Sequence, residues 1–127
     1  MNLLYIGLGG FLGSICRYLS FQALDRYYHR YHFPLGTLAV NALGSFLIGA
    51  ALALSIKHNI LGRHTLGHFL LVTGFLGGFT TFSAFSQDNL ILIMEKQYWL
   101  FALNTLLNVG LGLALVAAGY MLVERCF

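Results

Sequence analysis

The charged residues of this chain are few, and their positions divide the sequence into four long apolar segments. Only 9% of the 127 residues are Asp, Glu, Lys or Arg, against about one-quarter in an ordinary soluble domain. Only Arg17 and Asp88 interrupt the apolar segments, which span about residues 2–24, 36–56, 66–94 and 98–123. Each holds the roughly 20 residues that a helix needs to cross a membrane. We therefore predict a single-domain, all-α membrane protein with four transmembrane helices.

The start of the chain and its single proline fit this division. No Lys or Arg precedes the first apolar segment, and no small-residue cleavage site follows it. We therefore expect a retained helix and not a signal peptide. Pro34 precedes the second segment, where the missing N–H of a proline is tolerated at the first turn of a helix.

The middle of the third segment is a poor helix interior. Residues Gly74 to Phe85 read GFLGGFTTFSAF. Glycine costs about 1 kcal/mol relative to alanine in a helix, and threonine loses side-chain freedom there. At membrane depth, freed backbone groups are tolerated only where they are buried in protein or line an aqueous site. We therefore predict that the third helix is broken near its middle and that the functional site lies at the break.

The basic residues are balanced between the two sides of the predicted bundle. With both termini on one side, three lie on each: Lys57, Arg63 and Arg125 against Arg26, Arg30 and Lys96. Orientation in a membrane follows mainly from Lys/Arg asymmetry in short loops. Either charge near the first helix, such as Arg17, selects one orientation, or the chain inserts both ways and pairs as an antiparallel dual-topology homodimer. The second interpretation supplies the inverted symmetry that many transporters build from internal repeats.

Small and polar residues recur at helical spacing within the segments. Gly9 with Gly13, and Ser45 with Gly49, form small-xxx-small pairs suited to close helix packing within or between chains. Thr37, Asn41 and Ser45 share one helix face, and Asn104 and Asn108 share another. Single hydroxyls in membrane helices commonly bond back to the preceding turn, whereas an asparagine amide needs several partners in hydrocarbon. The asparagines therefore suggest a polar track.

Two aromatic residues follow the predicted break. Phe82 and Phe85 lie three residues apart, on the same face as the hydroxyl-rich segment that contains Ser83. The edge of an aromatic ring carries positive charge, so ring edges are able to accompany a small anion without trapping it as a guanidinium would. The alternative is that these rings only pack or face lipid.

Several classes of function are disfavoured. The segments hold no run of carboxylates, the histidines lie in or beside the breaks, and Cys16 and Cys126 stand at opposite ends of the chain. Neither a metal-ligand cluster nor a catalytic triad can be assembled from these residues. We therefore expect that the protein is not an enzyme, and the net charge of +3 gives no reason to expect a nucleic-acid partner.

Three motifs are distinctive: GGFLGSICRY at residues 9–18, PLGTLAVN at residues 34–41 and GFLGGFTTFSAF at residues 74–85. They resemble those of the small bacterial fluoride channels called Fluc or CrcB. Together with the four-segment length, the resemblance covers essentially the whole chain, and the third motif is the most specific. It implies a fluoride-selective, multi-pass channel in the bacterial plasma (inner) membrane, surrounded by lipid. It also implies passive export of F⁻ that limits fluoride toxicity, and an antiparallel homodimer.

The resemblance also implies roles for individual residues. Asn41 matches the pore asparagine, and Phe82 and Phe85 match phenylalanines whose ring edges line the route. Gly77 and Thr80 match positions whose carbonyls hold a central structural Na⁺ at the dimer interface. Other expected positions are Thr37, Ser83 and Asn108 in the fluoride pathway and Arg17 near a vestibule. The chain departs from the family at Ala84, where Thr is usual, and at Ser14, where Ala is frequent.

Two alternatives belong to other classes. A small dual-topology multidrug exporter needs an embedded carboxylate in its first helix, where this chain has Arg17 and no acid. A non-transporting assembly subunit leaves the clustered Asn, Thr and Phe residues unexplained.

Overall fold

In the computed structural model, the described residues are 2–24, 26, 32–58 and 61–126, and every long element among them is a helix. The elements are α1 (Asn2–Leu24), α3 (Leu35–His58), the π-helix η2 (His68–Leu76), α4 (Gly77–Phe79), α5 (Phe82–Met94), α6 (Tyr98–Leu106), the π-helix η3 (Leu107–Leu111) and α7 (Gly112–Cys126). They form four apolar spans long enough to cross a membrane. The prediction of an all-α chain with four such helices is confirmed.

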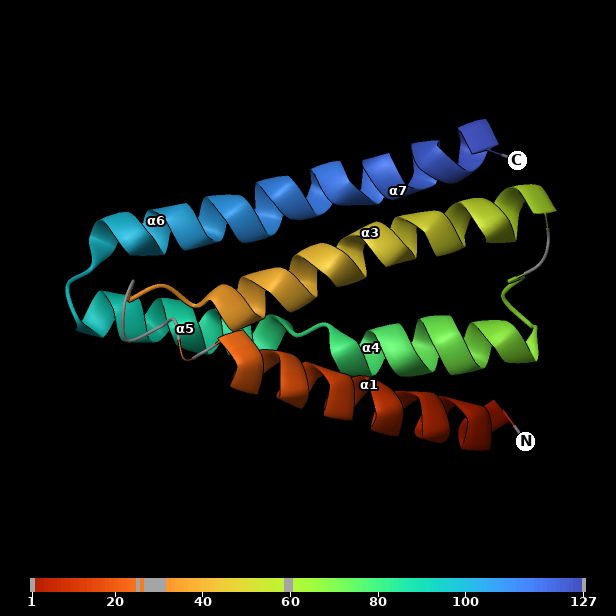
Figure 1. The fold of residues 1–127 in the computed structure, drawn as a ribbon, viewed down its shortest axis with the longest axis horizontal. Coiled ribbons are helices and arrows are strands. Elements are labelled where there is room, and N and C mark those ends of the chain that lie inside the picture. The colour runs from red at the N-terminus through yellow and green to blue at the C-terminus, as the bar shows by residue number, and fades with distance from the viewer. Residues whose placement is uncertain (1, 25, 27–31, 59–60, 127) are drawn as a thin grey trace.

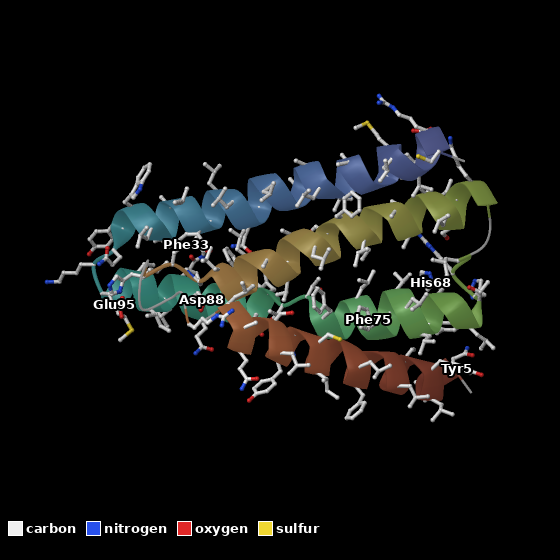
Figure 2. The ribbon with its side chains drawn as sticks, viewed as in Figure 1. Tyr5, Phe33, His68, Phe75, Asp88 and Glu95 are labelled. Atoms are coloured by element: carbon white, nitrogen blue, oxygen red, sulfur yellow. The ribbon has the colours of Figure 1, made fainter. Side chains whose placement is uncertain are left out.

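The four spans lie side by side in alternating directions (Figure 1), and both termini reach the same end of the bundle. The span α3 packs along α7, while α1 packs along η2 and α4. Tyr5 and His68 lie near the end that holds the termini, and Glu95 lies at the opposite end (Figure 2). In this topology the basic residues are divided between the two ends as predicted, with Lys57, Arg63 and Arg125 at one end and Arg26 and Lys96 at the other. Arg30 lies outside the described residues.

Glycines allow the helices of each pair to approach to backbone contact. A Cβ atom at Gly9 would meet the carbonyl oxygen of Leu70, and one at Gly13 would meet that of Phe75. Gly49 of α3 lies against the backbone of α7 in the same manner. Close approach of this kind lets backbones pack where the hydrophobic effect gives no driving force between helices. The small-residue pairs of α1 and α3 are therefore used for packing within the chain.

The third span loses helical geometry at two threonines. Thr80 has φ −76° and ψ 156°, and Thr81 has φ −152° and ψ 117°. The hydroxyl of Thr80 donates to the carbonyl of Leu76 at 2.9 Å, and the hydroxyl of Thr81 accepts from the N–H of Ala84 at 3.2 Å. Thr80 thus bonds to the end of the preceding helix, and Thr81 is the N-cap of α5.

The two sides of this interruption pack against different neighbours. Before it, η2 and α4 lie on α1, whereas α5 lies on α6 and, to a smaller extent, on α3. Only 11–22% of the residues in the most hydrophobic part of each span are buried within the chain. Phe11 and Trp99 remain 64% and 76% exposed. An apolar surface of this extent is typical of a protein covered by lipid or by another protein.

Candidate functional site

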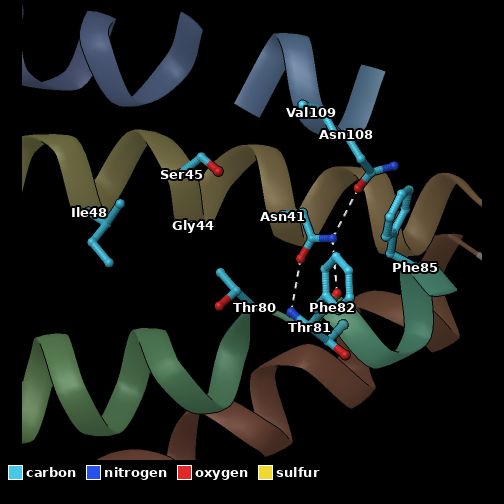
Figure 3. A pocket seen from close by; sticks show the side chains of 10 residues that line it. All are labelled: Asn41, Gly44, Ser45, Ile48, Thr80, Thr81, Phe82, Phe85, Asn108 and Val109. Carbon is cyan, nitrogen blue, oxygen red and sulfur yellow. Dashed lines mark hydrogen bonds between the residues drawn. The ribbon is translucent and has the colours of Figure 1, made fainter. Parts of the chain in front are cut away.

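A pocket of about 330 Å³ lies beside the interruption (Figure 3). Its wall is formed by α3, the threonine pair, α5 and η3. The residues that line it are Asn41, Gly44, Ser45, Ile48, Thr80, Thr81, Phe82, Phe85, Asn108 and Val109. The pocket therefore joins parts of the second, third and fourth spans at the point where the third span stops being helical.

The side chain of Asn41 connects α3 to the interruption. Its Oδ1 atom accepts from the N–H of Thr81 at 2.9 Å, and its Nδ2 atom donates to the carbonyl of Thr81 at 3.1 Å. The same Nδ2 atom donates to Oδ1 of Asn108 at 3.0 Å. Both amide protons and the amide oxygen of Asn41 are thus engaged, and the backbone polar groups of Thr81 are satisfied without a helical partner.

The two phenylalanines of the pocket have different environments. Their ring centroids lie 5.6 Å apart, with the ring planes tilted by 50°. Phe85 is 9% exposed and is fixed inside the chain, whereas Phe82 is 78% exposed and projects from the surface of the single chain. Figure 3 shows both rings beside Asn41 and Asn108. The pocket therefore combines side-chain amides with aromatic rings.

A row of hydrogen bonds leads from Asn108 away from the pocket. The Nδ2 atom of Asn108 donates to Oδ1 of Asn104 at 2.9 Å and to the backbone carbonyl of Asn104 at 3.0 Å. Asn104 is fully buried, and its Nδ2 atom donates to Oδ1 of Asn89 at 2.8 Å. Asn89 in turn donates to the hydroxyl of Thr105 at 3.2 Å, and that hydroxyl donates to the carbonyl of Phe101 at 2.9 Å.

Two other side chains expected in the fluoride pathway lie elsewhere. Thr37 is buried, and its hydroxyl donates to Oδ2 of Asp88 at 2.6 Å, where α5 faces α3 (Figure 2). Ser83 lies outside the pocket lining, with its hydroxyl 3.2 Å from that of Thr81. Of the six expected pathway residues, the pocket brings together Asn41, Phe82, Phe85 and Asn108. The transport roles of all six stay predictions.

Of the residues expected near a cation and a vestibule, Arg17 of α1 and Thr80 contact each other. The Nη1 atom of Arg17 donates to the carbonyl of Thr80 at 3.4 Å. Gly77 is exposed, and a Cβ atom there would meet nothing within 4 Å. Thr80 also lines the pocket, so this residue contacts both the pocket and Arg17.

Sequence reasoning missed two members of the polar interior, Asn89 and Thr105. The available signal was the presence of another asparagine in an apolar segment, since its amide requires partners. The described part of the chain holds no cluster of three or more His, Cys, Asp or Glu side chains suited to a metal ion. The chemistry of the pocket is accordingly that of neutral amides, hydroxyls, backbone groups and aromatic rings.

Four helices long and apolar enough to span a membrane, three of which line a neutral polar pocket, define a small integral membrane protein. The chain belongs to the family described as CrcB-like protein, Camphor Resistance (CrcB), whose family model matches residues 4–120. That match covers nearly all of the four spans.

Curated relatives agree with the family assignment. The chain is 45% identical over 123 residues to a protein of Campylobacter jejuni subsp. jejuni (strain 81-176), covering 97% of this chain and 98% of the relative. It is 44% identical over 115 residues to a protein of Elusimicrobium minutum, covering 91% and 87% respectively. Both relatives are named fluoride-specific ion channel FluC.

Proposed function

We propose that this protein is a fluoride-selective channel, not an enzyme, that lets F⁻ leave the cell passively across the bacterial plasma membrane. The observation that carries the proposal is the neutral, amide-lined pocket at the helix interruption, where Asn41, Asn108, Phe82 and Phe85 meet. The names of the curated relatives support fluoride as the ion.

The chemistry of the pocket suits a small anion that must also leave. Conduction requires a site that replaces the hydration shell of the ion but does not hold it too tightly. Asn41 and Asn108 bring neutral amides and Ser45 a neutral hydroxyl to the pocket wall. The edges of Phe82 and Phe85 add weak positive charge. The membrane potential supplies about 2.3 kcal/mol per unit charge for each 100 mV, which is enough to drive F⁻ outward without a coupled reaction.

We also propose that the channel is an antiparallel dual-topology homodimer. Three observations support this arrangement. The basic residues are balanced between the two ends of the bundle, Phe82 of the pocket is 78% exposed in the single chain, and Gly77 beside the interruption is also exposed. A second copy, inserted upside-down, would complete the walls of a pocket that one chain leaves open. Lipid would cover the remaining apolar surface.

A structural Na⁺ at the dimer interface is the cofactor that we propose. In a continuous helix, the carbonyls of Gly77 and Thr80 would accept from the N–H groups of Thr81 and Ala84. Those N–H groups instead donate to Asn41 and to the Thr81 hydroxyl. The two carbonyls are therefore available as hard oxygen ligands, and the residues fit a small cation. The Thr80 carbonyl would share its lone pairs with Arg17, 3.4 Å away.

Ion efflux from liposomes tests the proposed function. Purified protein is reconstituted at low density in liposomes loaded with potassium fluoride or potassium chloride, and valinomycin starts the efflux. We expect rapid fluoride loss and chloride loss near that of protein-free liposomes. Equal loss of both anions would contradict fluoride selectivity. Transport of cationic drugs against a proton gradient would support an exporter, and no transport of either kind would support an assembly subunit.

A further inference from the structure

The hydrogen bonds between the pocket and Thr105 all point in one direction. We use the name asparagine chain for Asn108, Asn104, Asn89 and Thr105. Every amide in it accepts at Oδ1 from the pocket side and donates from Nδ2 toward Thr105, over distances of 2.8–3.2 Å. The asparagine chain therefore presents an oxygen, the Oδ1 of Asn108, to the pocket.

The backbone of Thr81 sets this direction. Asn41 accepts from the N–H of Thr81 and donates to its backbone carbonyl. If the Asn41 amide turned over, its NH₂ group would face the Thr81 N–H and its oxygen would face the Thr81 carbonyl. The remaining proton on Nδ2 of Asn41 must then face Asn108, which accepts the hydrogen bond at Oδ1. Each following amide adopts the orientation that its neighbour leaves, as far as Thr105.

An anion in the pocket would reverse this preference. Next to Asn41, it would accept the proton that now goes to Oδ1 of Asn108. The Asn108 oxygen would then face a negative charge, whereas its Nδ2 atom would stabilise that charge. Asn108 cannot turn over alone, because its oxygen would meet the Oδ1 atom of Asn104 in place of a donor.

We propose that the asparagine chain turns over as a unit when fluoride enters the pocket, so that Asn108 changes from acceptor to donor. Asn104 and Asn89 turn over in turn, and the hydroxyl of Thr105, which both donates and accepts, rotates to donate to Asn89. The bonds to the carbonyls of Asn104 and Phe101 are lost, and the bonds to the anion offset them. Asn104, Asn89 and Thr105 are thus positioning residues, and this inference rests on the proposed fluoride function.

Side-chain amide resonances test the reversal directly. The chain has six asparagines, among them Asn2 at the start of α1, so selective ¹⁵N-asparagine labelling gives a simple spectrum. Spectra are compared in fluoride and in chloride at equal ionic strength. We expect the amides of Asn108, Asn104 and Asn89 to shift with one common fluoride midpoint, although Asn89 does not line the pocket. The amide of Asn2 serves as the unaffected reference.

A matched pair of variants at Thr105 tests the end of the asparagine chain. Thr105→Val keeps the shape but removes the hydroxyl, which accepts from Asn89 before the reversal and would donate to it afterwards, and Thr105→Ser keeps the hydroxyl. With Val, Asn89 lacks this partner in both orientations, and the reversal no longer breaks the bond from Thr105 to the Phe101 carbonyl. We therefore expect the half-saturating fluoride concentration for efflux to fall about fivefold, the value of roughly one hydrogen bond. With Ser, this concentration and the Asn89 shift should stay close to wild type.

The outcomes separate this inference from the proposed function. If the wild-type protein conducts fluoride while the Asn89 amide stays unchanged, the asparagine chain is static and the inference is wrong. It is also wrong if Val and Ser alter only thermal stability and leave the fluoride dependence of efflux per folded dimer unchanged. If the wild-type protein does not conduct fluoride, the proposed function itself fails.

Discussion

Asn41 on α3 satisfies both backbone polar groups of Thr81, accepting from its N–H at 2.9 Å and donating to its carbonyl at 3.1 Å. In hydrocarbon, each unsatisfied backbone group costs several kcal/mol. One side chain therefore stabilises the extended residues of the third span and, through its second amide proton, contacts Asn108 in the pocket. Formation of the interruption and formation of the pocket depend on the same amide.

Exchanging the Asn41 amide for a carboxylate should disrupt both the helix interruption and the pocket. Asn41→Asp keeps the acceptor for the Thr81 N–H but removes the donors to the Thr81 carbonyl and to Asn108. We expect a loss of about 1–3 kcal/mol of stability, the usual cost of leaving a buried polar group unpaired, together with loss of fluoride efflux. Thermal unfolding in detergent and liposome efflux measure the two effects. Asn2→Asp, the same change at an exposed position, is the control, and normal behaviour of Asn41→Asp would contradict the assignment.

The two phenylalanines should respond differently in stability but alike in transport. Phe→Ile keeps apolar bulk and removes the ring quadrupole. If ring edges accompany F⁻, fluoride flux per amount of folded protein should fall sharply for both Phe82→Ile and Phe85→Ile. Stability should fall mainly for Phe85→Ile, because Phe85 is 9% exposed and Phe82 is 78% exposed. Phe82→Tyr, which keeps a ring, is the control. Normal flux from both isoleucine variants would show that the rings only pack.

The proposed cation site predicts opposite results for substitutions at Thr80 and at Gly77. Thr80→Ala keeps the backbone carbonyl, so Na⁺-dependent stabilisation of the dimer should persist. Gly77→Val places its Cβ atom in open space within the chain, since a Cβ there meets nothing within 4 Å. It should nevertheless separate the dimer, which size-exclusion chromatography or single-molecule photobleaching would detect.

A second glycine variant supplies the comparison for that experiment. A Cβ atom at Gly78 would lie 2.5 Å from the carbonyl oxygen of Gly10, so Gly78→Ala should disturb packing between α1 and α4 inside each chain. A Gly77→Val protein that stays dimeric and retains its response to Na⁺ would contradict the proposed interface site.

Biasing the charge balance tests the antiparallel arrangement. Two lysines added near Lys96, at one end of the bundle, should force one orientation, since Lys/Arg asymmetry sets topology. Two added near Lys57 should force the other. We expect each biased protein to be inactive alone in a fluoride-resistance assay and the pair to regain activity when co-expressed. Adding one lysine at each end preserves the balance and is the control. Full activity from one biased protein alone would exclude the antiparallel dimer.

The sequence by itself determined the four spans and indicated where the backbone of the third becomes extended. Charge is so costly in hydrocarbon that charged residues delimit the four segments, with Arg17 and Asp88 as the two inside them. Helix propensity identified Thr80 and Thr81 as weak points, and the structure has extended backbone there. Local spacing also placed Asn41 and Ser45 on one face of the second span, and both line the pocket.

Only the tertiary structure decided which polar groups meet. Helical periodicity shows which residues share a face, but the rotation of each helix against its neighbours fixes the partner. Thr37 shares a helix face with Asn41, yet it bonds to Asp88, 51 residues away. Asn104 bonds across the α5–α6 turn to Asn89, a pairing that helical spacing does not indicate. These pairings arise because a buried amide or hydroxyl takes whichever partner the packing of apolar neighbours brings within about 3 Å.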